Sequence, residues 1–103
     1  MEITEAVLIP HLMSELGYSY QGAQLVVVKL RQSAPEIQAA FRVWWESGHI
    51  PELEVETYSV ARLMQHHSMN PIAALLTLDW LIREPAKALA SLQRGHDQVR
   101  KTD

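Results

Sequence analysis

The chain has 103 residues, 48% of them hydrophobic, which is a common size for a single domain and enough for a hydrophobic core. Its charged fraction of 20% is slightly low for a solvated monomer, and its net charge of −3 is unusual for a dedicated nucleic-acid binder. The chain has no cysteine, which excludes disulfides and thiolate metal sites.

A first helix is predicted from about residue 4 to residue 16. Its apolar residues follow helical spacing: Ile3, Val7, Leu8, Leu12 and Leu16. Pro10 lacks a backbone N–H, so we expect it to kink this helix or to end a first turn there. Gly17 is a typical helix stop, because glycine readily adopts the left-handed conformation that follows many helices.

A second helix is predicted from Ser19, a typical N-cap residue, to about residue 32. The three consecutive valines at residues 26–28 favour a strand locally. We still predict a helix, because four apolar residues share one helical face: Ala23, Val26, Val27 and Leu30. Residues 4–32 are therefore expected to form a helical hairpin.

A third helix is predicted over residues 35–47. Ser33 is its expected N-cap, Pro35 opens the first turn, and Glu36 is a first-turn acid. One stripe of this helix is expected in the core: Ile37, Ala40, Phe41 and Trp44. Gly48 is expected to end it.

A short strand and a pair of helices are predicted next. Residues 52–56 alternate strictly between acidic and apolar side chains, which is the two-residue period of a strand. Helices are predicted over residues 58–66 and 70–83, with Asn70 capping the second and Pro71 opening it. Four residues of the first helix are expected to face inward: Val60, Ala61, Leu63 and Met64. The second is expected to bury one face: Ala74, Leu75, Leu78, Leu81 and Ile82.

The end of the chain is predicted to be a short helix and a tail. The Glu84-Pro85 pair is expected to break the preceding helix and to start a last one over residues 85–94. Residues 96–103 are polar and lack an apolar period, so we expect a flexible tail there.

Together these elements predict an all-α domain over residues 1–95. We expect five or six short helices and one short strand near residues 52–56. The hairpin of residues 4–32 is expected to pack on a helix-turn-helix-like tri-helical core, residues 35–84.

The stretch from Leu63 to Leu81 carries a resemblance to a known superfamily. Met69 plugs a tight turn between two helices, Asn70 caps the second helix, and Ala74 lets the two helices cross closely. With the preceding helix and strand, this pattern resembles the helix-turn-helix and winged-helix superfamily. The resemblance implies a tri-helical core and a DNA-binding second helix. The pattern departs from a winged helix, because residues 84–103 contain no strand pattern for a wing.

The outer face of helix 70–83 does not suit DNA. Contacts to bases and phosphates need side chains such as Arg, Lys, Asn or Gln. This face is instead expected to be mostly apolar: Ile72, Ala73, Leu76, Asp79, Trp80 and Arg83. Its one arginine, Arg83, is expected to pair with Asp79 one turn earlier. Four glutamates without a basic residue among them precede the motif and would repel phosphates: Glu46, Glu52, Glu54 and Glu56. The apolar face needs a cover, either from this chain or from another chain, most simply in a twofold homodimer.

Trp45 is a further candidate, because adjacent Trp44 and Trp45 cannot both face the core from one helix. We therefore predict four interface residues: Ile72, Leu76, Trp80 and Trp45. His66 and His67 point about 100° apart on a helix, so they are not expected to bind one metal together. No catalytic residue, cofactor site or metal site is predicted.

Two hypotheses for function follow. The first is a small non-enzymatic module that self-associates, as a homo-oligomer, or docks on a protein partner. The alternative is a DNA-binding transcriptional regulator that uses the helix-turn-helix and a basic C-terminus: Arg83, Arg94, Arg100 and Lys101. No apolar run approaches the roughly 18 residues of a membrane span. Glu2 and Glu5 stand where a secretory signal would be basic, so we expect a cytoplasmic protein without membrane contact.

Overall fold

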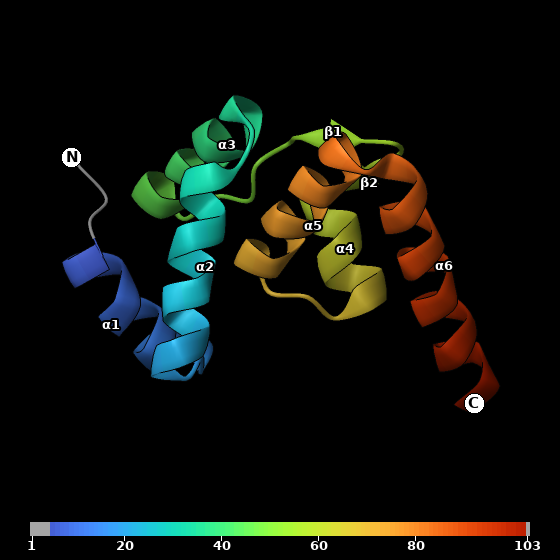
Figure 1. The fold of residues 1–103 in the computed structure, drawn as a ribbon, viewed down its shortest axis with the longest axis horizontal. Helices are drawn as coiled ribbons and strands as arrows, with labels where there is room; N and C mark the ends of the chain where they lie inside the picture. The colour runs from blue at the N-terminus through green and yellow to red at the C-terminus, as the bar shows by residue number, and fades with distance from the viewer. Residues whose placement is uncertain (1–4, 103) are drawn as a thin grey trace. The chain divides into compact units, whose positions relative to one another are not determined.

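The computed structural model describes the backbone of residues 5–102 and the side chains of residues 5–93. By its internal contacts the chain divides into two units, Met1–Ser33 and Ala34–Asp103. The described residues form six helices and one sheet of two very short strands, so the predicted all-α fold class is confirmed (Figure 1).

The first unit is a helical hairpin of α1 (Glu5–Leu16) and α2 (Tyr20–Gln32). The prediction that Pro10 ends a first turn is wrong, because α1 runs through it. Pro10 is the sixth residue of α1 and has no N–H, so the Ala6 carbonyl one turn earlier receives no helical hydrogen bond from it. Gly17 ends α1 with a φ of 74°, as predicted. The Ser19 hydroxyl caps α2 by accepting a hydrogen bond from the Gly22 N–H at 3.1 Å.

The two helices of the hairpin pack against each other. The four residues predicted to share one face of α2 are all buried: Ala23, Val26, Val27 and Leu30. On α1 the buried residues are Leu8, Ile9 and Leu12. An ion pair joins the helices at the surface, with 2.7 Å between the Glu5 carboxylate and the Arg31 guanidinium.

The second unit begins with α3 (Pro35–Ser47), whose predicted cap is wrong. Ser33 does not cap α3, because its hydroxyl donates a hydrogen bond of 2.6 Å to the Leu30 carbonyl and closes the end of α2. The N-cap position of α3 is occupied by Ala34, which has no capping side chain. Ile37, Ala40 and Phe41 are buried as predicted, whereas Trp44 is half-buried. Gly48 ends α3 with a φ of 75°.

The single strand predicted over residues 52–56 is instead part of a tiny hairpin. β1 (Glu54–Val55) pairs antiparallel with β2 (Tyr58–Ser59), and Glu56-Thr57 form the turn with φ values of 51° and 69°. Two positive φ values between paired strands are typical of a type I′ turn, which usually carries Asn-Gly. The sequence lacks that signal, which explains why the hairpin was not predicted.

The rest of the second unit is built around α5 (Pro71–Arg83), which packs against α3, α4 (Val60–His67) and α6 (Pro85–Thr102). The Ser59 hydroxyl caps α4, so this helix begins later than predicted. Asn70 caps α5 by accepting a hydrogen bond from the Ala73 N–H at 2.8 Å, and Pro71 opens it, as predicted. The buried apolar residues of α4 and α5 are Val60, Leu63, Ile72, Ala74, Leu75, Leu78 and Leu81. Ala61 and Ile82 were predicted to be buried and are exposed.

The last helix, α6, is longer than predicted. Its backbone is helical to Thr102, so residues 96–102, for which we expected a tail, continue the helix. After Gly95 this segment contains no glycine or proline that would end a helix. None of the helices described is long and apolar enough to cross a membrane.

Candidate interaction surface

α5 is apolar on nearly all sides, and its surroundings decide which side remains open. Three helices pack against it, and its buried residues cover about half of the helix circumference at about 100° per residue. The prediction of the outer face of α5 is therefore wrong in part. Ile72 is 0% exposed and lies in the core, and Asp79 is also buried.

The side of α5 that remains open is a stripe of four residues, which we call the α5 seam. Its members are Ala73, Leu76, Thr77 and Trp80. They follow the i, i+3, i+4, i+7 spacing of one helical face. The first three are half-buried and Trp80 is 37% exposed. Ala73 was expected on the outer face, although not as an interface residue, whereas Thr77 was missed.

Local hydrogen bonds hold the N-terminal half of the seam in place. The Thr77 hydroxyl donates to the Ala73 carbonyl at 2.8 Å and lies 3.4 Å from the Met69 sulfur. The polar atom of Thr77 is therefore satisfied within the helix, and its methyl group contributes to an otherwise apolar surface. Met69, which is half-buried, lies at the start of the seam.

Trp80 lies at the other end of the seam, beside a charged pair. Lys87 Nζ lies 2.9 Å from the Glu84 carboxylate. The pKa of Glu84 is below its usual 4.5 because Lys87 donates a hydrogen bond to it and carries a positive charge, with a smaller contribution from a hydrogen bond to the Trp80 side chain. The hydrogen bond to Glu84 and its negative charge in turn raise the pKa of Lys87. The large ring of Trp80 is thus exposed next to groups that stay charged at neutral pH.

The structure places Trp45 in a separate aromatic cluster on α3. Its ring is stacked with that of Phe41, with centroids 5.9 Å apart, and lies 6.4 Å from the ring of Trp44. Both tryptophans are half-buried. Of the predicted interface residues, Leu76 and Trp80 share the α5 seam, Ile72 belongs to the core, and Trp45 belongs to this cluster.

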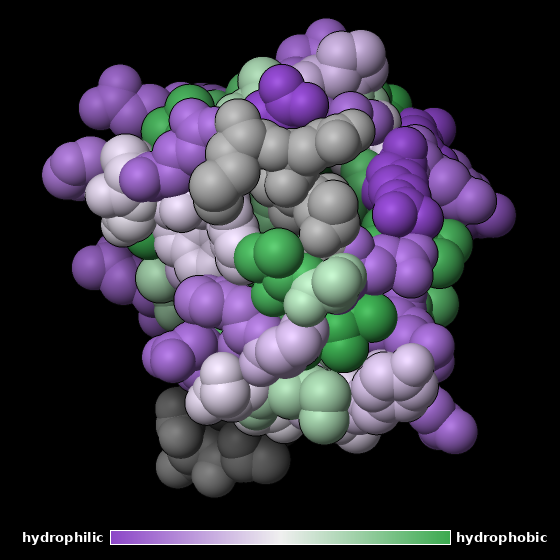
Figure 2. All heavy atoms as spheres, turned by 90° about the vertical axis from the view of Figure 1, so that its left-hand side faces the viewer, coloured by the Kyte–Doolittle hydropathy of each residue, from purple (hydrophilic) through white to green (hydrophobic). Residues whose placement is uncertain are grey.

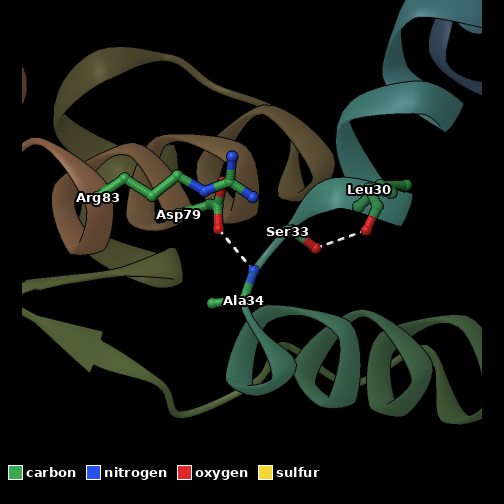
Figure 3. A network of polar contacts seen from close by, with 5 residues as sticks. All are labelled: Leu30, Ser33, Ala34, Asp79 and Arg83. Atoms are coloured by element: carbon green, nitrogen blue, oxygen red, sulfur yellow. Dashed lines mark hydrogen bonds and ion pairs between the residues drawn. The ribbon is translucent and has the colours of Figure 1, made fainter.

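The predicted ion pair between Asp79 and Arg83 is present at 3.1 Å, but Asp79 has a second role (Figure 3). Its other carboxylate oxygen accepts a hydrogen bond from the Ala34 N–H at 2.8 Å. A side chain of α5 therefore supplies the cap that α3 lacks. The sequence offered one indirect signal, which is an alanine at the N-cap position before Pro35.

A polar cluster holds the small hairpin against α4. The guanidinium carbon of Arg62 lies 4.8 Å from the centre of the Tyr58 ring, and Arg62 also donates a hydrogen bond of 2.8 Å to the Thr57 carbonyl. The His67 ring lies 6.1 Å from that of Tyr58. Within residues 5–93, no group of three or more His, Cys, Asp or Glu side chains could hold a metal ion.

The residues proposed for DNA contact are only partly described. Arg83 is paired with Asp79, and the side chains of Arg94, Arg100 and Lys101 lie outside the described residues.

Searches against protein-family models, curated proteins and solved structures gave no match to this chain. The helix-turn-helix resemblance therefore stays a prediction.

Proposed function

We propose that the chain is a small non-enzymatic module that binds an apolar helix face through the α5 seam. The second copy of the chain is the simplest occupant, because a surface that matches itself gives a closed twofold dimer. The observation that carries this proposal is Trp80, which is 37% exposed on a helix that is otherwise packed on three sides.

The chemistry of the seam supports a protein partner. Exposed tryptophans are enriched among the residues that contribute most to protein interfaces, and small neighbours such as Ala73 let another helix approach closely. The seam itself carries no charge, so burying it costs no desolvation of an ion. The polar groups nearest to Trp80, Glu84 and Lys87, pair with each other and lie at its edge.

The alternative, DNA binding by α5, finds less support in these side chains. The exposed side of α5 offers Ala73, Leu76 and Trp80, none of which can donate to base edges in the way that Arg, Lys, Asn or Gln can. The arginine at its C-terminal end is already paired with Asp79. The exposed glutamates at positions 52, 54 and 56 add negative charge to the same unit.

The test uses one variant and one matched control on the same helix. Trp80→Glu places a charge on the seam, whereas Ile82→Glu places the same charge on a residue of similar exposure, 39%, on another side of α5. Sedimentation velocity over a range of concentrations gives the mass of each protein. We expect wild type and Ile82→Glu to form species heavier than the monomer of 11.7 kDa, and Trp80→Glu to lose those that depend on the seam.

Far-UV circular dichroism of both variants checks that the helices are intact. The proposal fails if Trp80→Glu and Ile82→Glu associate equally. A titration of labelled random duplex at low salt tests the alternative, since non-specific DNA binding is electrostatic. Micromolar DNA binding that disappears as salt rises would favour the regulator.

A further inference from the structure

α1 carries apolar side chains around most of its circumference but has one helix, α2, to pack against within its own unit. Its buried side is formed by Leu8, Ile9 and Leu12. The other half of the helix is also uncharged and is exposed: Ala6, Val7, Pro10, Met13 and Ser14. Apolar helix faces are normally buried, so this open half of α1 is suited to a further helical partner.

α2 also carries an apolar patch opposite its buried face. Leu25 and Val28, one turn apart, are 55% and 46% exposed. Five of the nine large hydrophobic residues that are exposed within the described part of the chain belong to the hairpin: Val7, Met13, Tyr20, Leu25 and Val28. Apolar side chains visibly reach the surface among polar ones (Figure 2). The hairpin, a third of the chain, thus holds more than half of these exposed large hydrophobic residues.

The size of the hairpin indicates that it needs additional burial. Domains smaller than roughly 40 residues usually require disulfides, metals or oligomerisation for stability, and this unit has about 33 residues. Disulfides are excluded because the chain has no cysteine. Packing against a second hairpin, with four helices in contact, would bury part of this exposed apolar surface.

Charge identifies which helices would face each other. The charged residues of α1 are the acids Glu5 and Glu15, and those of α2 are the bases Lys29 and Arg31. The ion pair of 2.7 Å between Glu5 and Arg31 shows that this complementarity already operates within one hairpin. Between two copies, α1 against α2 repeats the attraction, whereas α1 against α1 brings like charges together.

We propose that α1 and α2 pair with the same hairpin of a second copy, with α1 of one copy against α2 of the other. The interface would be formed by the open half of α1, with Met13, and by Leu25 and Val28 of α2. This inference shares with the proposed function the idea of self-association, but it uses a different surface, so each can fail separately.

The first test is sedimentation velocity of the full chain with variants of the hairpin. Leu25→Glu and Met13→Glu place a charge in the interface, and Gln65→Glu places one on an exposed position of α4, outside the hairpin. We expect each of the first two to raise the dissociation constant of the dimer by about 30-fold or more, as for central interface residues, with Gln65→Glu close to wild type. Raising the salt concentration should also weaken the dimer, because exposed charges are screened.

The proposal is overturned if wild type is monomeric at all concentrations, or if Leu25→Glu associates like Gln65→Glu. A dimer that Trp80→Glu abolishes and Leu25→Glu leaves intact would assign association to the α5 seam alone. Circular dichroism separates loss of pairing from loss of folding. Both substituted side chains are exposed, so the helical content of the monomer is expected to stay unchanged.

Disulfide trapping tests the arrangement of the helices. Because the chain has no cysteine, Met13→Cys and Leu25→Cys each introduce a single reactive thiol. When the two proteins are mixed and oxidised, we expect the mixed dimer in excess over either homodimer. An excess of homodimers would contradict the contact of α1 with α2 of the other copy.

Discussion

Replacing Asp79 with alanine removes two contacts that meet at one carboxylate. One oxygen accepts a hydrogen bond of 2.8 Å from the Ala34 N–H, and the other pairs with Arg83 at 3.1 Å. The first contact caps α3 and lies in a partly buried place, whereas Arg83 is about half exposed. The two contacts should therefore contribute very different amounts to stability.

The magnitudes follow from burial and charge. A hydrogen bond to a charged group contributes about 1.5–3 kcal/mol, and its loss leaves a partly buried N–H without an acceptor. An exposed i, i+4 ion pair contributes only about 0.3–0.5 kcal/mol. We expect Asp79→Ala to lower the free energy of unfolding by about 2–3 kcal/mol, and Arg83→Gln by about 0.5 kcal/mol or less. Asp79→Asn keeps an acceptor oxygen and should fall between them.

Thermal unfolding followed by tryptophan fluorescence is a suitable assay. All three tryptophans, at positions 44, 45 and 80, belong to the unit that contains Asp79, so the signal reports that unit. A loss of 2 kcal/mol should lower its Tm by roughly 10 °C. If Asp79→Ala and Arg83→Gln lowered the Tm equally, the capping role of Asp79 would be refuted.

Three further predictions concern single contacts. Thr57→Gly should raise the stability of the second unit by about 1 kcal/mol in urea unfolding, because a β-branched residue is strained at a φ of 69°; an unchanged midpoint would contradict the strained turn. Asn70→Ala should cost about 1 kcal/mol by removing the acceptor for the Ala73 N–H, and a cost near zero would show that water replaces the cap. Lys87→Met should move the pKa of Glu84 up towards 4.5 in a carbon-detected NMR titration. Because the pKa of Glu84 is lowered in the folded protein, the Glu84–Lys87 pair stabilises the fold at pH values above 4.5. This contribution is lost as the pH falls through the lowered pKa of Glu84.

The features that were predicted correctly depend on local chemistry. Gly17 and Gly48 end helices because they reach positive φ at low cost, and Ser19 and Asn70 cap helices with side chains three residues from the N–H groups they bind. Each of these signals is complete within one turn of chain. They could therefore be predicted without knowing which helices pack together.

The features that were predicted wrongly depend on distant parts of the chain or on an unusual turn. Ser33 looks like a cap for α3, yet the cap is Asp79, 45 residues away. Ile72 has the phase of an outer residue, yet three helices surround α5 and bury it. The β-hairpin of β1 and β2 was missed because Glu56-Thr57 take the place of the usual Asn-Gly. In the candidate site, Ala73, Leu76 and Trp80 were placed on the open face from helical spacing, but Thr77 required the packing of α5.

The cap that joins α3 to α5 also bears on how the second unit folds. α4 and α5 follow each other closely in sequence, as do α5 and α6, so the contacts of each pair need only short loops to close. The bond between Ala34 and Asp79 closes a much longer loop, and the entropy of closure grows with loop length. Docking of α3 should thus follow formation of the α4–α5–α6 arrangement. Weakening this bond should mainly speed unfolding, while the rate of refolding changes little.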